Sequence, residues 1–258
     1  MQAYIVTGAA SGIGRAVAQG LAAWPDAALC LVDRNQQGLQ EVAAELAGKC
    51  AVDTLAGDLS SATFPIEAVE RCVGRFGNIA GLVSNAGVLK GAPLAELDVA
   101  DFDFLFAINT RPAWLMAKAA YPHLKASRGA IVATASIAAH YPAPPLGSYA
   151  ASKAALVMLI RQMAIEWGPD GIRCNSVSPG PTHTPMSPGY DERELREARE
   201  RSMPLRKLGL AQDVADAILF LLSPAAGHIT GQDIAVDGGL GSALMTLSGS
   251  GQGQPQNG

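Results

Sequence analysis

The sequence contains little charge of either sign. Charged residues make up 16% of its 258 positions, and the formal net charge is −4. A chain without a basic excess has no electrostatic reason to bind nucleic acid or an anionic membrane surface. No stretch of uncharged apolar residues approaches the roughly 18 positions that a membrane-spanning helix needs. Nucleic acid and membranes are therefore excluded from the expected partners.

Cysteine and histidine are few and scattered. None of the four cysteines stands at metal-ligand spacing from another: Cys30, Cys50, Cys72 and Cys174. We interpret them as reduced thiols of a cytoplasmic protein. The four histidines show no ligand spacing either, so no metal site is predicted: His123, His140, His183 and His228. No basic and apolar leader precedes the first apolar run, and we expect no signal peptide.

Short, continuously apolar runs alternate with helical patterns along the chain. Strands are predicted over residues 3–7, 28–32, 51–55, 79–84, 130–134, 172–177 and 233–236. Helices are predicted over residues 14–24, 36–47, 60–76, 101–125, 148–167 and 211–222. Continuous apolar runs are typical of parallel strands that are buried on both faces. The sequence therefore predicts an α/β fold: a doubly wound (Rossmann-type) seven-stranded parallel sheet with helices on both faces.

No internal repeat or linker divides the chain, and we expect one domain over residues 1–248. Residues 249–258 contain no apolar side chain and are predicted to be a disordered tail. The helices predicted over 101–125 and 148–167 are apolar nearly all round. They are either core helices of a large domain or the pairing surface of a homo-oligomer, a dimer or a tetramer. We favour the oligomer, because exposed apolar patches usually mark interfaces.

A glycine-rich loop follows the first expected strand and opens the first expected helix. Its sequence is Thr7-Gly8-Ala9-Ala10-Ser11-Gly12-Ile13-Gly14. Gly8 permits a tight turn, Gly12 lets a diphosphate approach the backbone, and Gly14 lets helix and strand pack closely. The helix N-terminus offers N–H groups and a positive dipole end to phosphates. A glycine loop alone is often only a tight turn, but its place between strand and helix predicts a dinucleotide site.

Asp33 ends the second expected strand, about 20 residues after Gly14. A carboxylate at this place can accept both ribose hydroxyls of adenosine and repel a 2′-phosphate, which predicts NAD. Arg34 beside it complicates the prediction, because a guanidinium can hold that phosphate. Ser11, where a basic residue would help to hold the phosphate, is neutral. Asp33 could also be an ordinary turn residue; we favour NAD over NADP.

Tyr149 and Lys153 stand four positions apart in a segment with an Ala-rich continuation. On a helix this spacing places both side chains on one face. A neighbouring ammonium stabilises a phenolate, and we expect the pKa of Tyr149 to lie below its usual value of about 10. Such a phenol can exchange a proton with an alcohol at neutral pH. Most pairs of this kind are only solvated surface residues, and the spacing by itself is weak support.

Other polar or turn residues follow successive predicted strands. Asp58, Asn85, Ser136 and Pro179-Gly180 come directly after the third, fourth, fifth and sixth. The carboxyl ends of parallel strands form one edge of a sheet, and ligands bind in the crevice there. Singly, Asp58 could be a helix cap and Asn85 part of a turn. Together they predict one site.

These motifs, taken in their order, resemble those of the short-chain dehydrogenase/reductase family, and the resemblance covers residues 3 to about 239. It rests on motifs listed here in chain order: Thr7-Gly8-x3-Gly12-x-Gly14, Asp58-Leu59, Ser84-Asn85-Ala86-Gly87, Asn109, Ser136, Tyr149-x3-Lys153, Pro179-Gly180, and Ile229-Thr230-Gly231-Gln232 followed by Val236-Asp237-Gly238-Gly239. Ser84 and Ala135 depart from the residues that are usual in the family. Neither departure falls on a catalytic position.

The resemblance implies a role for each matching position. Tyr149 would be the general acid/base, Lys153 would lower its pKa and hold the nicotinamide ribose, Ser136 would hydrogen-bond the substrate oxygen, and Asn109 would complete a proton relay through water. The cofactor-binding residues expected in all are Gly8, Ser11, Gly12, Ile13, Gly14, Asp33, Arg34, Asp58, Leu59, Asn85, Ala86, Gly87, Tyr149, Lys153, Pro179, Gly180, Thr182 and Thr184.

The substrate pocket is expected between the 137–148 loop and residues 182–206. The residues expected to touch substrate are Ser136, His140, Tyr141, Leu146, Tyr149 and Met186, although for His140 we favour a surface loop histidine over a substrate contact. The charged run 191–201 is predicted to be a mobile lid helix. The expected activity is an NAD-dependent interconversion of a secondary alcohol and a ketone. Two alternatives stay open: an NADP-dependent ketone reductase, and a catalytically silent dinucleotide-binding scaffold.

Overall fold

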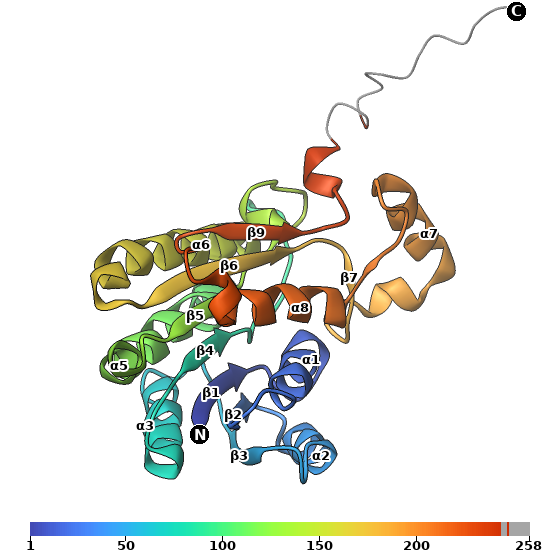
Figure 1. Cartoon of the computed structure of the whole chain (residues 1–258). Coiled ribbons are helices and arrows are strands. Elements are labelled where there is room, and N and C mark those ends of the chain that lie inside the picture. Colours follow the sequence, from blue (N-terminus) through green and yellow to red (C-terminus); the bar gives the residue numbers. More distant parts are fainter. Residues whose placement is uncertain (244–246, 248–258) are drawn as a thin grey trace, which may run out of the picture.

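A seven-stranded sheet is the centre of the fold in the computed structural model, which describes residues 1–243 and residue 247 (Figure 1). Its strands are β1 (Gln2–Thr7), β2 (Ala27–Asp33), β3 (Ala51–Ala56), β4 (Gly81–Ser84), β5 (Ala130–Thr134), β6 (Arg173–Pro179) and β9 (Asp233–Val236). The strand order is β3-β2-β1-β4-β5-β6-β9, and every neighbouring pair is parallel. The predicted fold class is confirmed.

Helices cover both faces of this sheet. They are α1 (Gly12–Leu21), α2 (Gln36–Glu45), α3 (Phe64–Phe76), α4 (Val99–Asn109), α5 (Arg111–Ser127), α6 (Ser148–Trp167), α7 (Arg193–Ser202) and α8 (Ala211–Leu222). Figure 1 shows α1, α2 and α8 on one face and α3, α5 and α6 on the other. Each face buries its own apolar cluster, one containing Leu21 and Ile218 and the other containing Met116 and Ile160. The continuous apolar runs of the strands follow from this double cover.

The helix predicted over 101–125 is wrong in one respect, because the structure has two helices there. Thr110 breaks them apart, with φ −125° and ψ −57°. The physical reason is Pro112, which has no N–H to continue the α-helical ladder. The break places Asn109 at the end of α4, whereas the sequence pattern puts it in the middle of a helix. Its side chain is thereby brought to the edge of the sheet.

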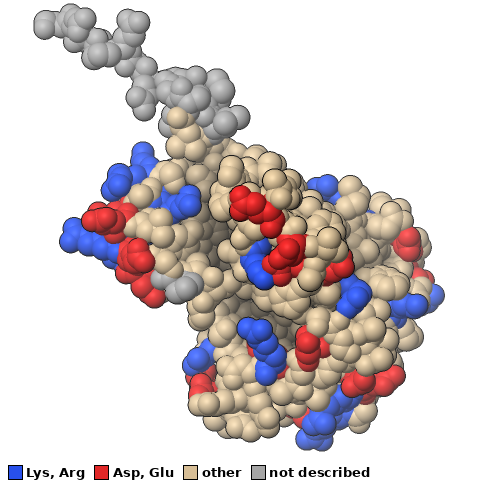
Figure 2. All heavy atoms as spheres, turned by 180° about the vertical axis from the view of Figure 1, so that it is seen from behind, with Lys and Arg blue, Asp and Glu red and all other residues tan. Residues whose placement is uncertain are grey.

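Short elements complete the chain after β6. Strand β7 (Thr182–His183) pairs in parallel with β8 (Gly209–Leu210), a pair that the sequence patterns do not predict. The short 3-10 helices are η1 (Ile137–Ala139), η2 (Gly168–Asp170), η3 (Pro188–Asp191), η4 (Pro224–Ala226) and η5 (Leu240–Ser242). Helix α7 lies where a lid helix was expected, and Figure 2 shows charged side chains of both signs gathered on it. The tail predicted over 249–258 and the expected domain limit at 248 both lie outside the described residues.

Strand β1 pairs with both β2 and β4, and the chain winds outward in opposite directions from this pair. The carboxyl ends of neighbouring strands diverge at such a switch point and leave a crevice. Every loop that carries a predicted site residue starts from this edge. The fold therefore brings together segments that are far apart in the sequence.

Candidate active site

The glycine-rich loop has the backbone shape that the sequence predicts. Gly8 has φ +66° and Gly12 has φ +53°, values that side chains on L-residues rarely allow. A Cβ at Gly14 would collide with the carbonyl of Gly8, and a Cβ at Gly8 would lie 2.9 Å from Nδ2 of Asn85. Helix α1 begins at Gly12, where the first N–H groups of a helix have no partner within it. The loop is a backbone cradle that fits a diphosphate.

Asp33 lies at the end of β2 and faces this loop. Its Oδ2 accepts a hydrogen bond from the Ala10 N–H at 3.1 Å, and its Oδ1 accepts one from the Asn35 N–H at 2.9 Å. These bonds fix the carboxylate beside the cradle and leave it partly exposed. A carboxylate fixed in this way has lone pairs available for ribose hydroxyls.

Asp58 is held by the turn that follows β3. Both its oxygens accept from Ser60, from the N–H and from the hydroxyl, each at 2.8 Å. These bonds, the backbone one above all, hold the pKa of Asp58 below its usual range, and the charge of Arg34 adds to the effect. Arg34 is exposed. The structure thus places Arg34 close enough to Asp58 for their charges to interact.

Thr7 is a residue that the site prediction does not include. Its hydroxyl accepts from the N–H groups of Asn85 and Ala86, at 2.9 and 3.0 Å. The Asn85 side chain in turn donates to the Thr7 carbonyl at 3.0 Å and accepts from the Thr134 hydroxyl at 3.0 Å. These bonds tie the ends of β1, β4 and β5 together. A buried threonine at the end of an apolar strand could have signalled this role, but only with its partners known.

The side chains of Tyr149 and Ser136 interact, although they come from different segments at the edge of the sheet. Helix α6 carries Tyr149 in its first turn, and Ser136 precedes η1. Burial raises the pKa of the Tyr149 phenol, and a hydrogen bond with the Ser136 side chain partly opposes that rise. The direction contradicts the expectation that Lys153 holds this pKa below its usual value. The desolvation of the phenol outweighs the other causes.

The position of the Lys153 ammonium explains why it does not lower the pKa of Tyr149. Its side chain is only 4% exposed, and its Nζ donates to the carbonyl of Thr134 at 2.8 Å. Burial lowers the pKa of Lys153 to about 8. The ammonium is therefore directed at the end of β5, and in this state it is not a hydrogen-bond partner of the phenol. Lys153 and Tyr149 still share one end of α6, as the spacing predicts.

Asn109 braces the neighbouring loop. Its Oδ1 accepts from the Val88 N–H at 2.8 Å, while its Nδ2 donates to the Val88 carbonyl and to the Ser152 hydroxyl, both at 3.1 Å. Gly87 passes close to it: a Cβ at Gly87 would lie 3.1 Å from Asn109 Oδ1 and 3.2 Å from Lys153 Nζ. The loop after β4 is thus held directly against the lysine. The water relay expected of Asn109 stays a prediction.

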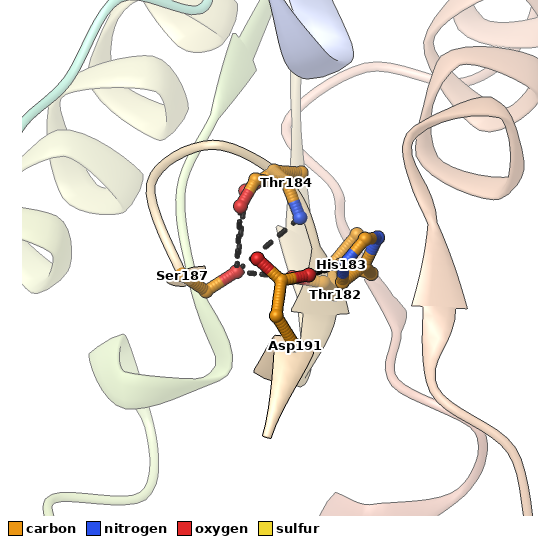
Figure 3. A network of polar contacts seen from close by, with 5 residues as sticks. All are labelled: Thr182, His183, Thr184, Ser187 and Asp191. Atoms are coloured by element: carbon orange, nitrogen blue, oxygen red, sulfur yellow. Dashed lines mark hydrogen bonds and ion pairs between the residues drawn. The ribbon is translucent and has the colours of Figure 1, made fainter. Parts of the chain in front are cut away.

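The segment after β6 closes the cofactor side of the crevice. Figure 3 shows its polar network: the Ser187 hydroxyl donates to the Thr182 carbonyl at 2.6 Å and contacts the Thr184 hydroxyl at 3.3 Å, and His183 pairs with Asp191 at 2.7 Å. Gly12 lies against Thr184, whose Cβ is 3.6 Å from where a Gly12 Cβ would stand. The other expected cofactor residues lie on the loops at this edge or at the ends of the elements that flank them: Ser11, Ile13, Leu59, Pro179 and Gly180.

The residues expected to touch substrate differ in their surroundings. Tyr141 and Met186 are exposed, by 54% and 50%, and Leu146 is half-buried. The ring of Tyr141 packs on Gly241, because a Cβ there would lie 2.7 Å from Tyr141 Cε2. His140 instead pairs with Asp233, its Nε2 lying 2.7 Å from Oδ2. The structure thus gives His140 a partner within the protein, which the sequence patterns do not reveal.

The last of the sequence motifs, Val236-Asp237-Gly238-Gly239, forms the end of β9 and a turn that packs against the segment after α7. A Cβ at Gly238 would lie 2.8 Å from Met203 Cε, and the Leu205 N–H donates to the Gly238 carbonyl at 3.1 Å. The Asp237 carboxylate accepts from the N–H groups of Gly239 and Gly241, at 2.9 and 2.7 Å. The turn after β9 therefore joins the chain that follows α7 to the loop that carries Tyr141.

Comparison with known proteins identifies the family. A family model described as enoyl-(acyl carrier protein) reductase matches residues 8–241. The chain is 36% identical over 237 residues to a D-threitol dehydrogenase of Mycolicibacterium smegmatis, covering 91% of each chain. Its structure is similar to that of levodione reductase, with a TM-score of 0.88, 33% identity and coverage of 94% of this chain and 98% of that one.

A second solved structure, a short-chain dehydrogenase/reductase described as a glucose/ribitol dehydrogenase from Brucella melitensis, matches with a TM-score of 0.87 and 36% identity, over 93% and 96% of the two chains. Together with the sheet and its edge, these similarities define an oxidoreductase of the dinucleotide-binding type. The chain belongs to the short-chain dehydrogenase/reductase family. Members of this family bind a nicotinamide dinucleotide, NAD or NADP. None of the helices in the described part of the chain combines the length and the apolar character of a membrane-spanning segment.

Proposed function

We propose that this protein interconverts a secondary alcohol and a ketone with NAD, and that Tyr149 is the general acid/base. One observation carries the proposal: the Tyr149 phenol meets the Ser136 side chain, while Lys153 is buried one helical turn further along α6, against Gly87 and the end of β5. These groups stand at the sheet edge where the glycine cradle also opens. A nicotinamide bound there supplies or accepts the hydride.

The protein residues handle the proton and the orientation. In oxidation the Tyr149 oxygen takes the hydroxyl proton of the alcohol as hydride leaves the carbinol carbon. In reduction the phenol returns that proton to the oxygen that becomes the alcohol. Ser136 hydrogen-bonds the same substrate oxygen, and Lys153 holds the cofactor ribose. Asn109 keeps the loop after β4 in register with α6 through Val88 and Ser152. Fixing both reactants in one crevice supplies the entropic part of the rate enhancement.

The direction of the Tyr149 pKa bears on the direction of the reaction. Because burial raises this pKa, the phenol holds its proton at neutral pH in the described state. This is the form that donates to a ketone. The reverse reaction needs phenolate, so its rate should rise with pH through the apparent pKa of the phenol. A positive charge brought near the phenol would move that rise to lower pH.

Asp33 supports NAD as the cofactor. Its carboxylate is fixed beside the cradle, where it would accept ribose hydroxyls and repel a 2′-phosphate. Arg34, the residue that could favour NADP, interacts with the charge of Asp58. We expect Asp33→Ala to lower the preference for NAD over NADP by about tenfold or more, as expected for hydrogen bonds to a charged group. A ratio of the two dissociation constants that does not change would favour the NADP-dependent ketone reductase.

The substrate we propose is a small neutral alcohol or ketone. The exposed side chains on the substrate side are mainly apolar, among them Tyr141, Met186 and Leu205, and the histidine of the loop is paired with Asp233. Two of the similar proteins are named for D-threitol and for levodione as substrates. A panel of polyols, cyclic diols and simple secondary alcohols with NAD, followed by the absorbance of reduced nicotinamide, tests this. A parent that oxidises and reduces nothing, and a Tyr149→Phe variant that binds cofactor equally well, would favour the silent scaffold.

We also propose a cytoplasmic homo-oligomer built through the helical segments 101–125 and 148–167. The helices in these segments expose large apolar side chains: Phe102, Phe104, Trp114, Met158 and Ile165. Unpaired, they would leave an apolar surface on α4 to α6 in contact with water. Light scattering after size exclusion distinguishes dimer, tetramer and monomer. Met158→Asp should shift the population towards smaller species, whereas Arg15→Asp, on α1, should not.

A further inference from the structure

A buried carboxylate lies behind the catalytic edge, outside the cofactor crevice. Asp233 is the first residue of β9, and its side chain is only 4% exposed. Oδ1 accepts from the Ser176 hydroxyl at 2.5 Å and Oδ2 from the Ser178 hydroxyl at 2.7 Å. The third partner is His140, whose Nε2 lies 2.7 Å from Oδ2. A buried carboxylate needs such partners, because an unpaired charge in the interior is costly.

His140 belongs to the turn that begins at Ser136. The Ser136 hydroxyl accepts from the Ala138 N–H at 3.1 Å, and the N–H groups of His140 and Tyr141 donate to the Ile137 carbonyl at 3.0 and 2.9 Å. Ser136 is therefore one end of a single hydrogen-bonded turn and His140 is the other. The ring of His140 connects that turn to a strand that is 93 residues further along the chain.

Two other roles for this cluster are excluded by its geometry. The hydroxyls of Ser176 and Ser178 donate to the carboxylate and not to the imidazole, so neither is an activated nucleophile of the Ser-His-Asp kind. Both serines are buried, at 1% and 0% exposure, and no substrate reaches them. The Nε2 of His140 is engaged with Asp233, which leaves that nitrogen unavailable for a substrate.

We propose that His140 is a positioning residue, which fixes the 136–140 turn to Asp233 and thereby sets the Ser136 hydroxyl against the Tyr149 phenol. Nε2 can donate to Asp233 from the charged ring or from the neutral ring in its Nε2–H tautomer, in which Nδ1 is left as an acceptor. Ser178 lies next to Pro179, so the same carboxylate also ties the turn to the end of β6. The inference rests on the proposed roles of Ser136 and Tyr149.

The test follows the titration of the Tyr149 phenol by ultraviolet absorbance, with Tyr149→Phe subtracted to remove the other tyrosines. Ser136→Ala should raise the pKa of Tyr149 by about half to one pH unit, the effect of one lost hydrogen bond. His140→Ala should raise it in the same direction, and the double variant should add no further shift, because both act through one contact. His140→Gln, which can still donate an N–H to Asp233, should restore most of the parent value.

Controls separate positioning from general damage. His228→Ala removes an exposed histidine outside this cluster and should leave the titration unchanged. If His140→Ala does not fold, His140→Phe keeps a ring at this exposed position but cannot donate. On a substrate from the alcohol panel, His140→Ala should lower kcat about tenfold with the dissociation constant of NAD within twofold.

The outcomes also separate the two proposals. The positioning role would be overturned by either of two results. In one, the pKa shifts of Ser136→Ala and His140→Ala add in the double variant; in the other, His140→Ala leaves the phenol titration unchanged. The titration needs no substrate. An alcohol panel without activity would therefore count against the proposed reaction, while the titration would still decide the role of His140.

Discussion

The two sides of the crevice are built differently. On the cofactor side, backbone groups and short side chains hold each polar group, as Ala10 and Asn35 hold Asp33, and glycines fill places where a Cβ would collide. On the substrate side, the side chains of Tyr141 and Met186 are about half exposed. The first side suits one ligand with one shape. The second tolerates different side chains, which is how one fold comes to serve different substrates.

We expect the largest effect at Tyr149, which lies between the cofactor side and the substrate side. Tyr149→Phe keeps the ring and its packing but removes the hydroxyl that we propose as the proton donor and acceptor. We expect kcat to fall by about 10³-fold, within the range for a general acid/base. The dissociation constant of NADH, measured by fluorescence titration, should stay within twofold. Activity within tenfold of the parent would assign the proton transfer to another group.

The cofactor side should tolerate no added methyl group at Gly14. A Cβ there would overlap the backbone of Gly8, which cannot move without opening the cradle. Gly14→Ala should weaken NAD binding by about 100-fold or prevent folding, as overpacking in a rigid site does. Gly74→Ala in α3 is the matched control, since a Cβ at Gly74 meets no atom within 4 Å. That change should be neutral or stabilise the protein by up to about 1 kcal/mol. Calorimetric titration and thermal melting check both variants, and equal NAD binding by the two would contradict the collision.

Burying Lys153 at this edge of the sheet should lower the free energy of unfolding of the protein. Its pKa is about 8 in the folded protein and about 10.4 when unfolded. Because the pKa of this lysine is lower in the folded state, its charge reduces the free energy of unfolding. The reduction is complete below about pH 8 and disappears as the pH rises from about 8 to about 10.4. Lys153→Met should therefore gain up to about 3 kcal/mol at pH 7, less about 1 kcal/mol for the lost bond to Thr134, and lose activity. Urea unfolding at pH 7 and pH 10 measures the difference, which should shrink at the higher pH. A variant that is less stable at pH 7, or a gain that does not depend on pH, would show that the penalty is absent.

The substrate side should give the smallest effects. Tyr141→Ala removes a ring that is more than half exposed and packs on Gly241. We expect KM to rise by at most about fivefold, with the melting temperature and NAD affinity nearly unchanged, because exposed substitutions have small effects. Steady-state kinetics on the best alcohol of the panel measures this. A large loss of stability would mean that the 137–147 loop is part of the rigid side.

The sequence by itself determined the features that depend on periodicity or on neighbouring residues, namely the strands and the short motifs. The apolar runs predict all seven strands of the sheet, because a strand buried on both faces must be apolar throughout. The glycine loop, Asp33 and the Tyr149–Lys153 pair are placed correctly relative to these strands, since each depends only on neighbouring residues. Their individual roles remain predictions. The resemblance to a family of oxidoreductases, visible in the order of the motifs, is confirmed by the comparisons.

Tertiary structure alone decided where the polar groups point. Lys153 faces the Thr134 carbonyl, the pKa of Tyr149 is raised by burial, and His140 finds Asp233 across 93 residues. The break at Thr110, which delivers Asn109 to Val88, also escaped the hydrophobic pattern. The break has a local cause in Pro112, which the pattern of apolar residues does not register, whereas the other three results share one physical reason. Desolvation and hydrogen bonding depend on which distant segments pack together, and periodicity along the chain carries no information about those neighbours.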